Sequence, residues 1–145
     1  MSYLLQSDFK SLIKQNRLAD LLDDEVDTPE EVFSEAVEDT TGLVADHLDR
    51  YDIAAEFEKE GDERNKSCLY YCKSLCLYIL YNRIPDDEVP ERVIKNYNDA
   101  FDSLEKIAAG KKNITLPLKM DDSNGDGIET KKTKFRYGGS KPRKY

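Results

Sequence analysis

The sequence has no run of apolar residues that approaches the length of a membrane span, so we expect no membrane association. Its N-terminus also has no basic stretch followed by a long apolar one. We therefore expect no secretory signal, and a chain made and kept in a cytoplasm. The 145 residues fit one domain with a tail, and 39% hydrophobic residues are enough for one modest core.

Histidine is almost absent, which limits the chemistry that the chain can perform. The single histidine, His47, lies in the segment ADHLDR, but hydrolytic metal chemistry needs several histidines. We interpret it as a core or interface residue. No Gly-rich loop precedes a helix, and no serine lies in a nucleophile elbow. The acids at 86–88 suit capping and solvation, so we expect no enzyme, no catalytic residue and no cofactor.

Cysteine is also scarce, and three cysteines without a secretory signal argue against a disulfide framework. Cys68, Cys72 and Cys76 recur every four residues, so they lie on one helical face. A closed zinc site needs four ligands, and iron–sulfur sites draw cysteines from loops with tighter spacing. We predict that these cysteines are small buried apolar side chains and not metal ligands.

The stretch DDSNGDGIE at 121–129 matches the beginning of an EF-hand calcium loop. With Asp122 in the first position, the next two ligand positions hold oxygen side chains and Gly127 takes the sharp turn. The position that requires a bidentate carboxylate holds Thr133, and neither flank reads as a helix. We interpret the stretch as a polar turn, and ion binding there stays open.

Charge is divided unevenly along the chain. Residues 1–110 carry 26 acids and 12 bases, a net charge of −14, whereas residues 111–145 carry 4 acids and 10 bases, a net charge of +6. From Thr130 to the end there are seven bases and no acid. A basic tail on an acidic body often mediates an interaction, and a solvated terminus is the alternative. The body should repel DNA, which suits a surface that DNA slides past.

Apolar residues at helical spacing predict a first helix that begins at Ser7 or Asp8 and ends near Leu22. A second helix is predicted from the capping box at Thr28, with Pro29 in the first helical position. Residues 40–42 are expected to kink or divide this second helix. The acidic residues that follow, at 52–65, suit a short helix or a loop.

The strongest helical signal covers about Glu63 to Arg83 and is apolar on most of its circumference. Such a helix is buried on several sides, in the centre of a bundle or against another subunit. Its tyrosines are therefore candidates for contacts between subunits: Tyr70, Tyr71, Tyr78 and Tyr81.

A last helix is predicted from about Pro90 to Ala109, with Gly110 as its C-cap. The predicted fold class is mainly α, a small four- to five-helix bundle over residues 1–110. Residues 111–145 form a second part, a basic C-terminal arm that is extended or a β-hairpin.

The arm is predicted from a change of period after Gly110, where apolar residues begin to alternate at 114–120 as in an edge strand that carries a proline. Alternation returns at 129–137. A basic, aromatic and alternating segment favours strand addition to a partner, although single-stranded nucleic acid and a disordered tail remain alternatives. The candidate binding residues of the arm are Lys131, Lys132, Lys134, Phe135, Arg136, Tyr137, Lys141, Arg143, Lys144 and Tyr145.

Several segments share the order and spacing of a known family. The last helix follows the pattern Y-x-D-A-x-x-x-L-x-x-I-A-x-G-K, and LVADHLDRYDI and RYGGSKPRKY match further segments. The chain resembles the head–tail connector (adaptor or head-completion) proteins of tailed bacteriophages, in particular those of Mu-like prophages. It departs from that pattern at 52–65, which is longer and more acidic, and at His47, which replaces an aromatic residue.

The resemblance implies a virion protein that is assembled in the bacterial cytoplasm and lies in the neck. About twelve copies would form a ring beneath the portal protein, extend the DNA channel and offer a surface to further neck or tail-completion proteins. DNA would pass through without sequence-specific binding. The family's C-terminal extension typically reaches the portal or a neighbouring subunit, so we expect residues 130–145 to bind the portal.

A different class of function also fits an acidic body. The chain could be a free cytosolic regulatory protein that acts as a DNA mimic or a protein-binding adaptor. A mimic needs its charge on one exposed face and has no use for a basic tail, and it would compete with DNA for its target.

Overall fold

The computed structural model describes residues 3–84 and 88–119 of the chain. The predicted hairpin arm beyond Lys119, with its candidate binding residues and the calcium-like stretch, lies outside the described residues. The arm prediction and the division of the chain into two parts therefore stay predictions.

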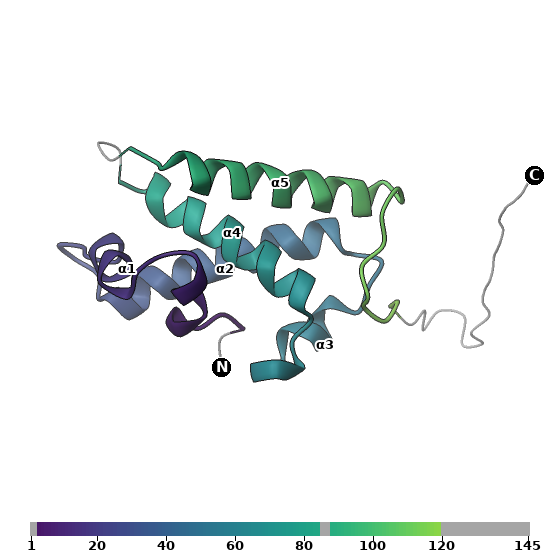
Figure 1. The fold of residues 1–145 in the computed structure, drawn as a ribbon. Coiled ribbons are helices and arrows are strands. Elements are labelled where there is room, and N and C mark those ends of the chain that lie inside the picture. The colour runs from purple at the N-terminus through teal and green to yellow at the C-terminus, as the bar shows by residue number, and fades with distance from the viewer. Residues whose placement is uncertain (1–2, 85–87, 120–145) are drawn as a thin grey trace, which may run out of the picture.

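The described residues are mainly helical and form a small bundle, as the sequence predicted (Figure 1). None of their helices is long and apolar enough to cross a membrane. In chain order the elements are the 3₁₀ helix η1 (Gln6–Ser11), α1 (Gln15–Leu21), α2 (Pro29–His47), α3 (Ile53–Phe57), the 3₁₀ helix η2 (Gly61–Glu63), α4 (Lys66–Asn82) and α5 (Glu91–Ala108).

The centre of the bundle is α4, which packs against both α2 and α5. Its side chains are buried in several directions around the helix axis, so an all-round apolar helix lies at the bundle centre, as predicted. Residues 3–22, named here the N-terminal segment, run along α4 on a further side. The buried residues of α4 are Cys68, Tyr71, Cys72, Ser74, Leu75, Cys76, Leu77, Leu80 and Tyr81.

Local capping explains where three of the helices begin or end. The Thr28 side chain accepts a hydrogen bond from the Glu31 N–H, and the Glu31 carboxylate accepts one from the Thr28 N–H, so the predicted capping box is confirmed. Asn65 caps α4 in a similar way through the Cys68 N–H. Gly110, with a φ of 80°, ends α5 in the left-handed conformation that favours glycine.

The prediction of one continuous first helix is wrong, because the segment divides into η1 and α1. The Leu12 carbonyl accepts a hydrogen bond from Arg92 Nη2 at 2.7 Å, a partner from α5 that takes the place of an amide in the next turn. The break also allows both Phe9 and Leu18 to be buried in the same core. Tertiary contacts therefore outweigh local propensity here.

The second helix is not divided at residues 40–42, because α2 is continuous through Gly42. A kink there stays a prediction. The Thr40 and Thr41 hydroxyls donate hydrogen bonds to carbonyls one turn earlier, at Ala36 and Val37, so the polar side chains are satisfied within the helix. The region 52–65 contains α3 and η2, as expected of a short helix or loop.

After α5 the chain passes through turns and bends across the end of the bundle (Figure 1). Among the described residues the only strand-like pairing is an isolated antiparallel bridge between Tyr51 and Leu118. The Asp52 N–H donates to the Pro117 carbonyl at 2.9 Å, and the Lys119 N–H donates to the Arg50 carbonyl at 2.8 Å. Of the predicted edge strand, the described part thus forms one bridge and no longer ladder.

We expect the replacement Thr28→Ala to lower the free energy of unfolding by about 1 kcal/mol, because the first turn of α2 loses its side-chain acceptor. Urea denaturation followed by circular dichroism measures this loss. The exposed Ser34, on the same helix, provides the control: Ser34→Ala should change the stability by no more than about 0.5 kcal/mol. Equal effects of the two replacements would contradict the capping role.

Candidate interaction surfaces

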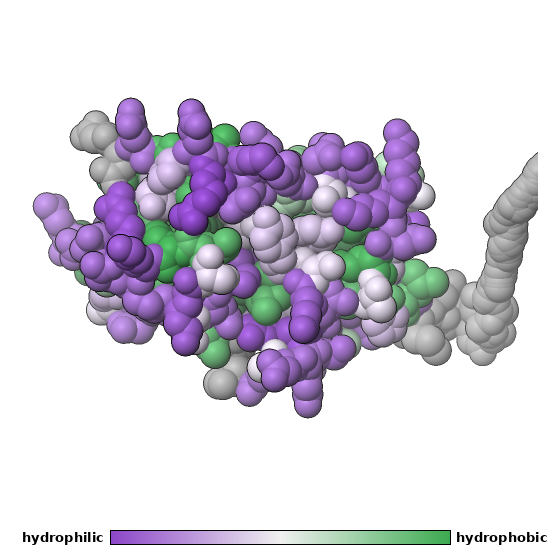
Figure 2. Space-filling model, viewed as in Figure 1, coloured by the Kyte–Doolittle hydropathy of each residue, from purple (hydrophilic) through white to green (hydrophobic). Residues whose placement is uncertain are grey.

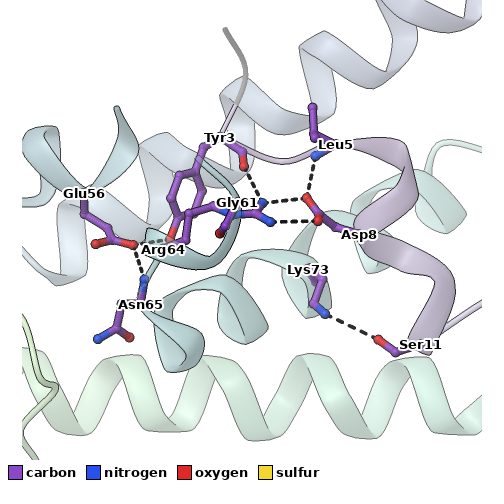
Figure 3. A network of polar contacts seen from close by, with 9 residues as sticks. All are labelled: Tyr3, Leu5, Asp8, Ser11, Glu56, Gly61, Arg64, Asn65 and Lys73. Carbon is purple, nitrogen blue, oxygen red and sulfur yellow. Dashed lines mark hydrogen bonds and ion pairs between the residues drawn. The ribbon is translucent and has the colours of Figure 1, made fainter. Parts of the chain in front are cut away.

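The N-terminal segment is held on the bundle by Arg64 (Figure 3). Its guanidinium donates two hydrogen bonds to the Asp8 carboxylate, from Nη1 at 2.7 Å and from Nη2 at 2.9 Å. It also donates to the Tyr3 carbonyl at 2.9 Å and to the Gly61 carbonyl at 2.8 Å. One side chain from the residues before α4 therefore fixes both the beginning of the chain and its own loop.

The contact with Arg64 lowers the pKa of the Asp8 carboxyl. Partial burial would raise the pKa of the Asp8 carboxyl, but hydrogen bonds from Arg64 and from the Leu5 N–H, together with the charge of Arg64, outweigh burial and hold the pKa below its ordinary value. The two side chains are only 8% and 13% exposed, so the pair is well shielded from water.

A buried carboxylate forms a second tie to the N-terminal segment. Glu56 on α3 is 1% exposed, and its Oε2 accepts hydrogen bonds from the Tyr3 hydroxyl and from the Asn65 N–H (Figure 3). Its Oε1 has no hydrogen bond within the described residues but lies 3.4 Å from the Lys59 ammonium. Burial and the hydrogen bond with Glu56 raise the pKa of Tyr3, which keeps this hydroxyl a donor.

The same region fixes the point from which the C-terminal arm continues. Asn65 Nδ2 donates to the Thr115 carbonyl at 2.7 Å, and Arg50 donates from Nη2 to the Ile107 carbonyl at the end of α5. With the bridge at Tyr51, these bonds hold residues 114–119 against the bundle, and Ile114 is buried. The last described residues include Leu118, which is 66% exposed.

A row of aromatic rings crosses the bundle from α4 to α2. Tyr78 stacks on Tyr97 with ring centroids 4.0 Å apart, Tyr97 lies 5.8 Å from Phe101, and Phe101 lies 5.2 Å from His47. All four rings are half-buried. His47 is thus packed at the bundle surface and not in the core, with Nδ1 3.0 Å from the Leu43 carbonyl, and a role at an interface stays a prediction.

The four candidate tyrosines differ in their exposure to solvent. Tyr71 and Tyr81 are buried within the bundle, so they have little surface to offer a second copy. Tyr70 is 39% exposed and lies beside Asn96, and Tyr78 belongs to the aromatic row. The inter-subunit prediction is therefore narrowed to Tyr70 and Tyr78, for which it stays a prediction.

The three cysteines lie in the core, free and fully buried, as predicted. A hydrogen bond with Cys68 and burial raise the pKa of Cys72, and burial raises the pKa of Cys76 to about 12. Thiols of this kind are unreactive at neutral pH. Within the described parts of the chain, no cluster of three or more His, Cys, Asp or Glu side chains is arranged to hold a metal ion.

Sequence reasoning missed the polar residues that tie the elements together, namely Arg50, Glu56, Arg64 and Asn65. One signal was present: Arg64 is a base inside a strongly acidic stretch. Glu56 occupies a buried position of the short α3, where an apolar residue would be expected. Nothing in the sequence identified the partners of these side chains, because Tyr3, Asp8, Ile107 and Thr115 are far away along the chain.

A family model described as Bacteriophage Mu, Gp36 matches residues 3–131. The chain belongs to this family. It is therefore a Mu-like bacteriophage protein of the structural or morphogenetic kind, in a family not known for enzymes. No match was found among curated proteins or solved structures.

For this Mu-like protein we expect Arg64→Leu to lower the free energy of unfolding by about 3 kcal/mol, since it leaves the shielded Asp8 carboxylate without its partner. Relative to wild type, the variant should show a larger increase in the rate of amide hydrogen exchange in residues 3–12 than in α4. The exposed Lys66→Leu is the matched control and should change neither quantity appreciably. If the N-terminal segment kept its protection without Arg64, the proposed clamp would be wrong.

The Asp8 carboxyl should also give the protein a pH-dependent term in its stability. Its folded pKa lies below the unfolded value of about 3.9, so the stabilisation is fully present above that pH and is lost as the pH falls through the folded pKa. Asp8→Asn should therefore lie furthest below wild type above pH about 5, with the gap closing below pH about 4. Urea midpoints measured from pH 7 to 3 test this, with exposed Asp20→Asn as the control. A gap that is constant with pH would contradict the prediction.

Proposed function

We propose that this Gp36-family protein is a head–tail connector, which forms a ring of about twelve copies beneath the portal protein. The ring extends the DNA channel, links the capsid to the tail and presents a surface to further neck or tail-completion proteins. In this proposal the protein belongs to the neck of the virion and is assembled in the bacterial cytoplasm.

The observation that carries the proposal is the fixed starting point of the basic arm. Residues 114–119 are held on the bundle through Asn65, Arg50 and Asp52, and seven bases without an acid follow from Thr130 onward. A rigid bundle with an anchored basic extension suits a subunit that docks on a larger assembly, because main-chain pairing and charge then act from a defined place.

The charge of the bundle supports the channel role. Residues 1–110 carry a net charge of −14, which repels DNA phosphates and lets a duplex pass without adhering. The portal would be contacted by the arm, through Lys131, Lys132, Lys134, Phe135, Arg136, Tyr137, Lys141, Arg143, Lys144 and Tyr145.

A DNA mimic is the second candidate, and one observation favours it. Between Arg17 and Arg50 the sequence has 12 acids and no base, and the exposed residues of α2 belong to this stretch. A mimic would compete with DNA for a protein target and would not need a portal. The basic arm and the membership of a structural phage family favour the connector.

The connector proposal predicts that the protein binds the portal ring from the same genome with about one copy per portal subunit. Light scattering of the purified mixture measures the mass of the complex. Reversing three arm charges, with Lys131→Glu, Lys132→Glu and Lys134→Glu, should weaken this binding at least about tenfold, because it replaces attraction by repulsion.

The matched control reverses three exposed lysines of the bundle, Lys66, Lys95 and Lys106, and should leave portal binding within about twofold of wild type. Circular dichroism verifies that both variants are folded. Full portal binding by the arm variant would refute the docking role. Competition with DNA for a host protein, without portal binding, would replace the connector by the mimic.

A further inference from the structure

We propose that the exposed acidic side of α2 in one copy binds a basic face on a second copy of this chain. The basic face is formed by Lys10, Lys14, Lys73 and Arg92. This inference rests on the proposed ring, for which it names the two surfaces that neighbouring subunits bring together.

The acidic side of α2 is a stripe of one sign. Glu35, Glu38, Asp39 and Asp46 recur at helical spacing and are all exposed. No base occurs in α2 apart from His47, and within the described residues no ion pair involves these four acids. Like charges so arranged repel one another, so the stripe is electrostatically unfavourable until a partner of opposite charge covers it.

Gly42 lies within this stripe and gives an independent reason to expect a close contact. It is exposed in the interior of a continuous helix, where glycine costs about 1 kcal/mol relative to alanine. A Cβ added there would meet nothing within 4 Å, so no contact inside the bundle requires the glycine. A glycine for which the bundle gives no internal reason fits the close approach of a neighbouring chain.

The basic face is assembled from three parts of the chain. Lys73 on α4 donates to the Ser11 hydroxyl at 3.4 Å, and Arg92 on α5 donates to the Leu12 carbonyl at 2.7 Å. The residues that they contact, Ser11 and Leu12, lie in the chain between the exposed Lys10 and Lys14. Residues 9–19 contain no acid, and the nearest carboxylate before them, Asp8, is occupied by Arg64.

The two faces point in different directions, as a ring requires. The buried side of α2 faces α4 and the N-terminal segment, where Phe33 packs against Phe9 at 5.8 Å, so its acidic side points away from both. Figure 1 shows the N-terminal segment in front of α2. Two complementary patches on different sides give a head-to-tail contact, which closes into a ring when the rotation allows.

The contact is expected to depend on charge more than on apolar area. On the face drawn in Figure 2 the surface is mostly hydrophilic, with apolar side chains in small separate patches. On α5, in contrast to α2, two ion pairs form within the helix, Lys95 with Asp99 at 3.1 Å and Lys106 with Asp102 at 3.0 Å. The unpaired acids of α2 are therefore the charges available to a second copy.

A charge exchange in the full-length protein tests the proposal. An acidic-side variant carries Glu35→Lys, Glu38→Lys and Asp39→Lys, and a basic-face variant carries Lys10→Glu and Lys14→Glu. In sedimentation equilibrium without portal, wild type should self-associate more strongly at low salt than at high salt. Each variant alone should associate at least about tenfold more weakly, and an equimolar mixture should recover most of the loss.

Gly42→Ala gives a second test that does not change the charge. We expect a higher urea midpoint, because alanine favours the helix, together with weaker self-association, because the methyl group enters the contact. A variant that gains stability and associates as wild type does would argue against a close approach at α2.

Other occupants of the acidic side give different results, each of which overturns the proposal. If reversal of Lys131, Lys132 and Lys134 abolishes association while Lys10→Glu with Lys14→Glu does not, the arm covers α2. A wild-type chain that stays monomeric at every concentration and salt also overturns it. Charge-exchange rescue without portal binding would keep this contact and reject the connector, whereas portal binding without rescue would do the reverse.

Discussion

The fold depends on one constraint, that α4 must be covered on nearly its whole circumference. Burying residues such as Tyr71, Cys72 and Leu77, which point in different directions, requires α2, α5 and the N-terminal segment together, since no single helix can cover more than one side. Of the three segments that cover α4, the N-terminal segment has the least regular structure, because it consists of a 3₁₀ helix and a short α-helix. Short helices of this kind have little stability of their own and need tertiary ties.

Those ties are polar and come from residues around the ends of α4. Arg64 holds Asp8 and the Tyr3 carbonyl at one end, and Arg83 donates to the Leu21 carbonyl and to Asp24 at the other. The Arg64–Asp8 pair is the shielded one, so either of its charges would be costly without the other. The same region binds Thr115 through Asn65, so the beginning of the chain and the start of the arm are fixed by one group of contacts.

The sequence was informative where structure depends on short-range chemistry. The capping box at Thr28, the end of α5 at the left-handed Gly110 and the burial of the cysteines follow from residues close together in the chain, and all three are confirmed. The contacts that sequence reasoning missed between distant elements have one cause in common. The break after Ser11 depends on Arg92, about eighty residues away, and the roles of Glu56 and Arg64 depend on partners more than fifty residues away. Periodicity carries no information about such pairs.

The distribution of charge distinguishes the surfaces of the bundle from one another. If the protein needed charge only for solubility, mixed signs would serve on every helix, and α5 follows this rule with its internal ion pairs. The exposed side of α2 does not have mixed signs, because only acidic charged side chains surround its exposed glycine. Both features make the isolated helix less stable, and neither is required by packing within the bundle. A contact outside the single chain accounts for both at once, which is why we place the subunit contact on α2 and not on α5.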